Sequence, residues 1–336
     1  ERINADHSSS LRNKTIFDEY SALLNQPTEV MSFQEKMMLL RKLVLKKGIP
    51  DDIDNFSEEN RINNKPSIRI VVWKLLLGAY HVDAAHYIAL IKEGPTAADQ
   101  KIRNDTFRTF KGDQDFWNHV TEAKMSRVLN AFVRNYFQPN IQKTSMNNEQ
   151  DWKEDIQSDT NENKEESGHK WSLSHIGYVQ GMNILVAPFL YVMPELDAFA
   201  SFSQLIMKHC PRYVLRNLEG THRGCYLVGR CLEVLDSELY EHITQKMRIQ
   251  ADLFAFPIVM TLFASVRPFH EVLKVWDALF AFGVHFNIIL CAVHIMLIRE
   301  KLLAEDSAYR LQREIRENPL DAELLITCGL KMCRFI

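Results

Sequence analysis

Residues 178–194 read YVQGMNILVAPFLYVMP, a short polar start followed by a long apolar run. The apolar run predicts a buried helix over residues 178–193. A buried helix favours Leu or Ala over a polar amide, so Gln180 is unexpected between Tyr178 and Gly181. The stretch therefore raises the question of which other residues could share a site with Gln180.

Helical periodicity continues on both sides of this stretch. Before it, the apolar spacing predicts helices over residues 33–47, 67–77, 83–93, 96–110 and 114–136. After it, helices are predicted over residues 196–209, 217–235, 237–248, 250–265, 268–282, 285–303, 307–317 and 320–335. No convincing strand alternation occurs, and 12 Gly and 11 Pro are few for an all-β sandwich. The sequence predicts an all-α fold, a single irregular multi-helix domain over residues 31–336.

Two polar segments depart from this pattern. Residues 1–30 predict a loose N-terminal tail. Residues 138–172 are dominated by Asn, Gln, Glu, Asp, Lys and Ser. So few apolar side chains cannot offset the entropy lost on ordering, so we expect a disordered acidic insertion within the domain.

Composition excludes several classes of protein. The formal net charge is −3, without the clustered Lys and Arg of a nucleic-acid surface. Six cysteines form no CxxC pair, which is typical of reduced thiols inside a cell. The apolar run over residues 253–266 is too short to span a bilayer, so we expect a cytoplasmic protein without a transmembrane segment.

Two sets of residues, a triplet and a pair, carry helical spacing. Ile102, Asp105 and Arg108 share one helix face, with Ile102 inward, Asp105 at the rim and Arg108 within reach of its carboxylate. Spacing alone favours a solvated ion pair there. Arg69 and Trp73 are four residues apart, which indicates a buried Trp covered by the Arg stem.

These residues belong to an ordered set of motifs. The set contains RxxxWxxLLG with Arg69 and Trp73, IxxDxxR with Ile102, Asp105 and Arg108, YxQGMN with Tyr178, Gln180, Gly181 and Asn183, and WDxxFxxG with Trp276 and Asp277. In this order the set resembles the TBC domain, an all-helical family of GTPase-activating proteins, mostly for Rab-type GTPases.

The resemblance implies roles for individual residues. Arg108 would be an arginine finger and Gln180 a residue that positions the attacking water, supplied in trans to a small Ras-like or Rab-like GTPase. Asp105 would hold Arg108, and Gly181 would let the backbone approach the nucleotide, with Tyr178 and Asn183 shaping the site. The two fingers should then open onto one concave surface, and the chain would catalyse no reaction on its own.

Other chemistries lack their motifs. The twelve His form no HExxH or zinc-spaced cluster, so no metal site is predicted. There is no GxSxG, GxxxxGK[ST] or GxGxxG motif either. We therefore expect no cofactor of the chain's own, with GTP and Mg²⁺ carried by the partner GTPase.

Within the family, the amino-acid sequences of whole segments are most similar to those of the fungal branch that restrains mitotic exit and septation. Members of that branch act at the spindle pole body with a separate scaffold subunit, and this resemblance implies the same here. Three alternatives stay open: a non-catalytic TBC-fold adaptor in a two-subunit complex, a Rab activator in membrane traffic, and a helical scaffold unrelated to GTPases.

Overall fold

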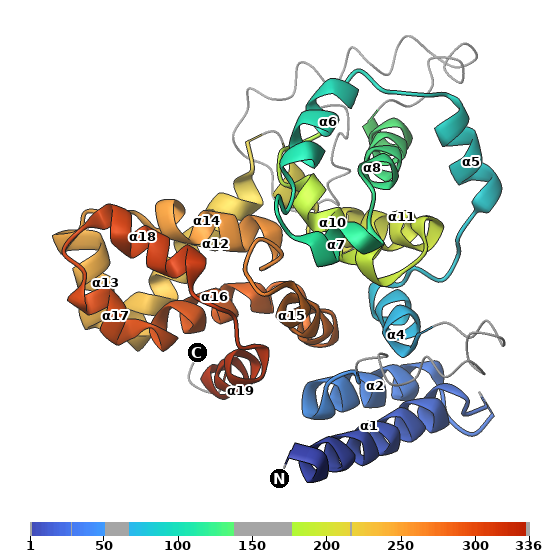
Figure 1. The fold of residues 1–336 in the computed structure, drawn as a ribbon, viewed down its shortest axis with the longest axis horizontal. Helices are drawn as coiled ribbons and strands as arrows, with labels where there is room; N and C mark the ends of the chain where they lie inside the picture. The colour runs from blue at the N-terminus through green and yellow to red at the C-terminus, as the bar shows by residue number, and fades with distance from the viewer. Residues whose placement is uncertain (1, 28, 51–66, 138–176, 216, 334–336) are drawn as a thin grey trace, which may run out of the picture.

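The computed structural model describes residues 2–27, 29–50, 67–137, 177–215 and 217–333, with only the backbone for residues 2–12. Helices make up the regular structure throughout these ranges, and no strand occurs in them (Figure 1). The all-α prediction is therefore confirmed. The predicted insertion at residues 138–172 lies outside the described residues and stays a prediction.

The helical boundaries follow the predicted periodicity closely. The first part of the chain forms α1 (Arg2–Leu24), α2 (Phe33–Lys47), α4 (Ile68–Leu77), α5 (Ala84–Lys92), α6 (Asp99–Arg108), α7 (Gln114–His119), α8 (Glu122–Phe137), α10 (Met182–Val192) and α11 (Glu195–Gln204). The second part forms α12 (Glu219–Leu235), α13 (Ser237–Glu241), α14 (Ala251–Thr261), α15 (Phe269–Phe282), α16 (Phe286–Leu297), α17 (Arg299–Ala304), α18 (Ala308–Glu317) and α19 (Ala322–Met332). Shorter π turns at Leu205–His209 and His242–Lys246 extend α11 and α13, and Pro211–Val214 is a 3-10 turn.

Helix α1 corrects the prediction of a loose tail over residues 1–30. It lies beside α2 (Figure 1), and the side chains of Ile16 and Tyr20, one turn apart, are buried. The Tyr20 hydroxyl donates to the carbonyl of Gly48 at 2.8 Å, and Lys47 pairs with Glu19 at 2.5 Å. Residues 13–24 are therefore part of the domain, because these contacts with distant residues order a segment of weak periodicity.

Several predicted helices also differ from the structure: for example, the one over residues 178–193 begins only at Met182. The predicted helix over residues 114–136 breaks at Val120, whose backbone is extended, and Thr121 accepts the N–H of Lys124 at the start of α8. The predicted helix over residues 285–303 breaks at Ile298. The predicted helix over residues 96–110 begins only at Asp99, and the N–H and hydroxyl of Thr96 both donate to the Asn130 side chain.

In Figure 1, α5, α6, α8 and α11 lie on one side of the molecule and α12, α13, α17 and α18 on the other, and α10 contacts α14 between them. On one side, α5, α6, α10 and α11 pack against α8. On the other side, α12 packs against α14 and α16, and α14 contacts α18. Helix α15 contacts α2, α4 and α19, so it connects the N-terminal helices to the C-terminal half of the chain.

A buried ion pair fixes α15 against α4. Arg69 and Asp277 are almost fully buried, and the Arg69 Nη2 atom lies 3.1 Å from the Asp277 carboxylate. The same carboxylate accepts the indole N–H of Trp73 at 2.6 Å, and Arg69 also donates to the carbonyl of Ile49. One carboxylate thereby bonds to both residues of the RxxxW spacing, so Arg69 and Trp73 hold the fold together rather than reach a ligand.

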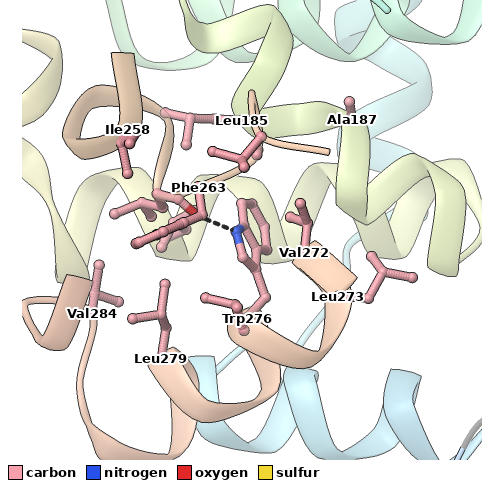
Figure 2. Close-up of a cluster of buried hydrophobic side chains, with 14 of the residues drawn as sticks. Leu185, Ala187, Ile258, Phe263, Val272, Leu273, Trp276, Leu279 and Val284 are labelled. Carbon is pink, nitrogen blue, oxygen red and sulfur yellow. Dashed lines mark hydrogen bonds between the residues drawn. The ribbon is translucent and has the colours of Figure 1, made fainter. Parts of the chain in front are cut away.

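Trp276 lies at the centre of the core beside this ion pair. Figure 2 shows its indole among Leu185, Val272 and Leu279. The indole N–H donates to the carbonyl of Leu262 at 2.7 Å. Its ring centroid lies 5.7 Å from that of Trp73 and 5.2 Å from that of Phe189. These aromatic contacts join α4, α10 and α15, because each ring belongs to a different helix.

No helix within the described ranges combines the length and hydropathy needed to cross a bilayer.

We predict that Asp277→Ala lowers the free energy of unfolding by about 3–5 kcal/mol, because it leaves the Arg69 charge buried without its partner. Urea denaturation followed by circular dichroism measures this. Glu233→Ala is the matched control: it removes the partner of Arg230 in an exposed pair, so it should change stability by at most about 1 kcal/mol. Equal losses in the two variants would contradict the anchoring role of Asp277.

Candidate functional site

Helix α6 places Arg108 in its last turn, with the side chain in solvent. Ile102, Asp105 and Thr106 form the buried face of this helix. The Arg108 side chain is 64% exposed, and a cation at the C-terminal end of a helix also interacts favourably with the helix dipole. The helix therefore presents a guanidinium outward from a buried base.

The Asp105 carboxylate binds this guanidinium from the buried face of α6. Arg108 donates from Nη2 to Asp105 Oδ1 at 2.7 Å and from Nε to the carbonyl of Asn104 at 3.2 Å. The sequence placed Asp105 at the rim of the helix face; that is wrong, because the residue is only 4% exposed. Its second oxygen, Oδ2, is buried with no hydrogen-bond partner among the described residues. A carboxylate in this setting gains more from Arg108 than a solvated one does.

Gln180 lies in the turn directly before α10, and its side chain is exposed. Gly181 follows with a φ of 109°, a backbone region that favours glycine. A Cβ at this position would lie 3.0 Å from Cε of Met260, so the close approach at Gly181 is to a core side chain of α14. The turn is thus fixed by packing, and the apolar run that follows is buried in the core.

Asn183 organises this turn. Its Oδ1 atom accepts the N–H of Gly181 at 3.1 Å and the hydroxyl of Tyr178 at 3.3 Å. Its Nδ2 atom donates to the Thr109 hydroxyl at 2.8 Å and to the Asp105 carbonyl at 3.3 Å. The amide therefore joins the turn that carries Gln180 to the end of α6 that carries Arg108.

Tyr178 and Lys101 complete the neighbourhood of the turn. Lys101 Nζ lies 3.5 Å from the Tyr178 carbonyl oxygen and 5.8 Å from the centre of its ring. Burial, and next the nearby Asp105 carboxylate, raise the pKa of the Tyr178 hydroxyl, so it stays a neutral donor. Lys101 and Arg108 are seven residues apart on α6, which puts both cations on the same face, the one beside the turn.

Sequence reasoning missed two members of this arrangement, Thr109 and Lys101. Thr109 directly follows Arg108 in the chain, and nothing in that position distinguishes a buried hydroxyl from a solvated one. Lys101 could have been found from its helical spacing to Arg108. The remaining predicted residues around the turn, Tyr178, Gly181 and Asn183, are all buried there.

A cavity of about 720 Å³ lies on another side of α6, between α5 and α8. Phe107, Asn104 and Arg103 line it, but neither Arg108 nor Gln180 does. The concave surface shared by the two fingers therefore stays a prediction.

Comparison with known proteins adds a family match. Residues 134–303 match the family described as the Rab-GTPase-TBC domain, a range that includes the Gln180 turn and Trp276 but begins after α6.

Alignments with whole proteins cover α6 as well. The "Putative mitotic check point protein BUB2" of Dictyostelium discoideum is 32% identical over 98% of this chain and 78% of its own length. "Cell division control protein 16" of Schizosaccharomyces pombe is 36% identical over 76% of this chain and 73% of its own length. The crystal structure of the Ypt/Rab-GAP domain of Gyp1p has the same fold, with a TM-score of 0.67 at 16% identity, covering 96% of this chain and 99% of that one.

We expect Gly181→Ala to lower the free energy of unfolding by about 1–2 kcal/mol, because an L side chain is strained at this φ and the added Cβ crowds Met260. Thermal unfolding followed by calorimetry or circular dichroism measures the loss. Gly177→Ala in the same segment is the control: nothing lies within 4 Å of its added Cβ, so a change below about 0.5 kcal/mol is expected. A neutral Gly181→Ala would show that the turn does not depend on this backbone geometry.

Proposed function

Since the chain belongs to the Rab-GTPase-TBC domain family, we propose that it is a GTPase-activating protein whose Arg108 and Gln180 enter the active site of a small Ras-like or Rab-like GTPase. The observation that carries the proposal is the buried bridge through Asn183, which ties the turn of Gln180 to the end of α6 that bears Arg108. GTP and Mg²⁺ belong to the partner.

The arginine meets the electrostatic demand of the reaction. Hydrolysis of GTP moves negative charge onto the γ-phosphoryl oxygens and the bridging oxygen of the leaving group. A guanidinium stays ionised and presents a planar fork of donors to phosphate oxygens. Arg108 is exposed and bound to a buried carboxylate on one side only, so its outer face can reach a partner. Lys101 adds positive charge beside the same turn.

The glutamine meets the geometric demand. The attacking water must lie in line with the leaving group. The carbonyl oxygen of an amide can accept a hydrogen bond from that water while its NH2 group donates one to a phosphate oxygen. Gln180 is exposed in a short turn with α10 buried behind it, so its backbone is held while its side chain is accessible. These properties support the role of a water-positioning residue.

The cellular role is proposed from the relatives. Two aligned relatives carry the names of a mitotic check point protein and a cell division control protein. We place the chain in the same process, as an activator that restrains mitotic exit and septation by keeping its GTPase in the GDP-bound state. By resemblance to that branch it would act from the cytoplasm at the spindle pole body, together with a scaffold subunit.

The mechanism is tested by single-turnover GTP hydrolysis with a panel of purified Rab-type and Ras-type GTPases, with and without the co-purified scaffold subunit. Arg108→Ala and Gln180→Ala should each lower the stimulated rate by about 10³-fold or more, because each removes a group that acts in the transition state. Gln180 is exposed, so Gln180→Ala should leave thermal unfolding unchanged. Arg108→Ala should lower the unfolding temperature, because the buried Asp105 carboxylate loses its partner, so circular dichroism must show that this variant is folded at the assay temperature.

Two matched variants serve as controls. Arg103→Ala removes another exposed, ion-paired arginine of α6, and Gln100→Ala removes an exposed glutamine of the same helix; both should keep full stimulation. Full activity in both finger variants would refute the two-finger mechanism. Tight binding of a GTPase by the unmodified protein, without stimulation even when the scaffold is present, would favour the adaptor role.

A further inference from the structure

We propose that Thr109 and Asn183 are positioning residues that hold the arginine and glutamine fingers at a fixed separation. The inference rests on the proposed function. It adds a clamp, which we define as the hydrogen-bonded side chains of Thr109 and Asn183 that join the end of α6 to the turn before α10. Neither side chain is exposed enough to touch a partner protein, since Thr109 is 1% and Asn183 5% exposed. Their effect on hydrolysis would therefore act through Arg108 and Gln180.

The Thr109 hydroxyl has a defined role in both of its hydrogen bonds. It donates to the carbonyl of Asp105 at 2.9 Å and accepts from Asn183 Nδ2 at 2.8 Å. With its proton directed to Asp105, the hydroxyl oxygen offers its lone pairs to the amide. The Thr109 hydroxyl therefore links α6 to α10, and its two hydrogen bonds fix the direction in which its proton points.

Asp105 and Asn183 extend this pair in both directions. The Asp105 side chain binds Arg108, while its carbonyl accepts from both Thr109 and Asn183. On the opposite side, Asn183 Oδ1 accepts the N–H of Gly181, the residue next to Gln180. An unbroken series of hydrogen bonds thus runs from the guanidinium of Arg108 to the peptide unit that follows Gln180.

Burial of these groups restricts their movement. Water cannot replace a lost partner at a site this enclosed, so each polar group must keep its bond or stay unsatisfied. The rest of α10 is anchored by apolar side chains, and loosening the clamp would move the turn without unfolding the helix. A displacement of about 1 Å between reacting groups can cost about 10²-fold in rate, which makes the clamp matter for hydrolysis.

The first experiment needs no GTPase. Thr109→Val removes the hydroxyl at nearly constant volume, and amide hydrogen exchange by NMR reports the Gly181 N–H. We expect this amide to exchange about tenfold faster in the variant, as for the loss of one buried hydrogen bond. Thr109→Ser, which keeps the hydroxyl, should restore the unmodified rate.

Thr106→Val provides a matched control. Thr106 lies on the same buried face of α6, and its hydroxyl has no hydrogen-bond partner among the described residues. The same chemical change should therefore leave Gly181 exchange as it is. Unchanged exchange in Thr109→Val, or equal acceleration in Thr106→Val, would overturn the clamp.

The second experiment tests positioning, with the GTPase that the unmodified protein stimulates most strongly. Thr109→Val should lower the maximal single-turnover rate by about 10- to 100-fold and leave the half-saturating protein concentration within about twofold. In a Gln180→Ala background the same substitution should change the rate by less than about twofold, because no glutamine finger remains whose separation from Arg108 the clamp can set.

The outcomes separate this inference from the proposed function. If no GTPase responds to the unmodified protein, the proposed function fails, and the exchange experiment still decides whether the clamp exists. If Arg108→Ala and Gln180→Ala abolish stimulation but Thr109→Val retains the full rate, the function stands and the positioning role is wrong. An undiminished effect of Thr109→Val in the Gln180→Ala background would also overturn it.

Discussion

The fold depends on one buried carboxylate, that of Asp277. An ion removed from water needs partners on every side, and Asp277 finds them in Arg69 and Trp73, about two hundred residues earlier in the chain. This requirement permits one relative placement of α4 and α15. Because Trp276 comes next to Asp277 and its ring contacts Phe189 of α10, the same placement sets the position of α10 and of the turn before it. The candidate site is therefore determined by a contact in the core.

The candidate site has two parts, a set of buried residues that hold its geometry and two exposed residues that can contact a partner. Buried groups, Asp105, Thr109 and Asn183, exchange hydrogen bonds with one another, whereas Arg108 and Gln180 extend from them into solvent. Such an arrangement suits a protein that completes the active site of another molecule, since the reacting groups must be accessible and still arrive in a defined orientation. The large cavity beside α6 lies outside this arrangement, because neither Arg108 nor Gln180 lines it.

Sequence reasoning predicted the helices well, because each long amphipathic or apolar segment carries its own periodicity. It failed where distant contacts decide the outcome. The segment around Tyr20 reads as a polar tail, and only its contact with Gly48 and α2 orders it. Asp105 has the spacing of a surface ion pair, and neither its burial nor the bond of its carbonyl to Asn183 of α10 can be revealed by a pattern within α6. The residues of the site could be listed from motifs, but their connections, and Thr109 among them, required the packed chain.

The exposure of the two fingers on a buried frame has an evolutionary consequence. Exposed side chains usually contribute little to folding, so under the proposed function one substitution at an exposed position such as Gln180 can end catalysis while the domain stays folded. Descendants of an activator with this architecture can therefore become pure binding proteins in a single mutational step, whereas a reverse change needs the frame to have been preserved. In a relative that has lost one finger, retention of Thr109 and Asn183 would indicate that catalytic activity was lost recently.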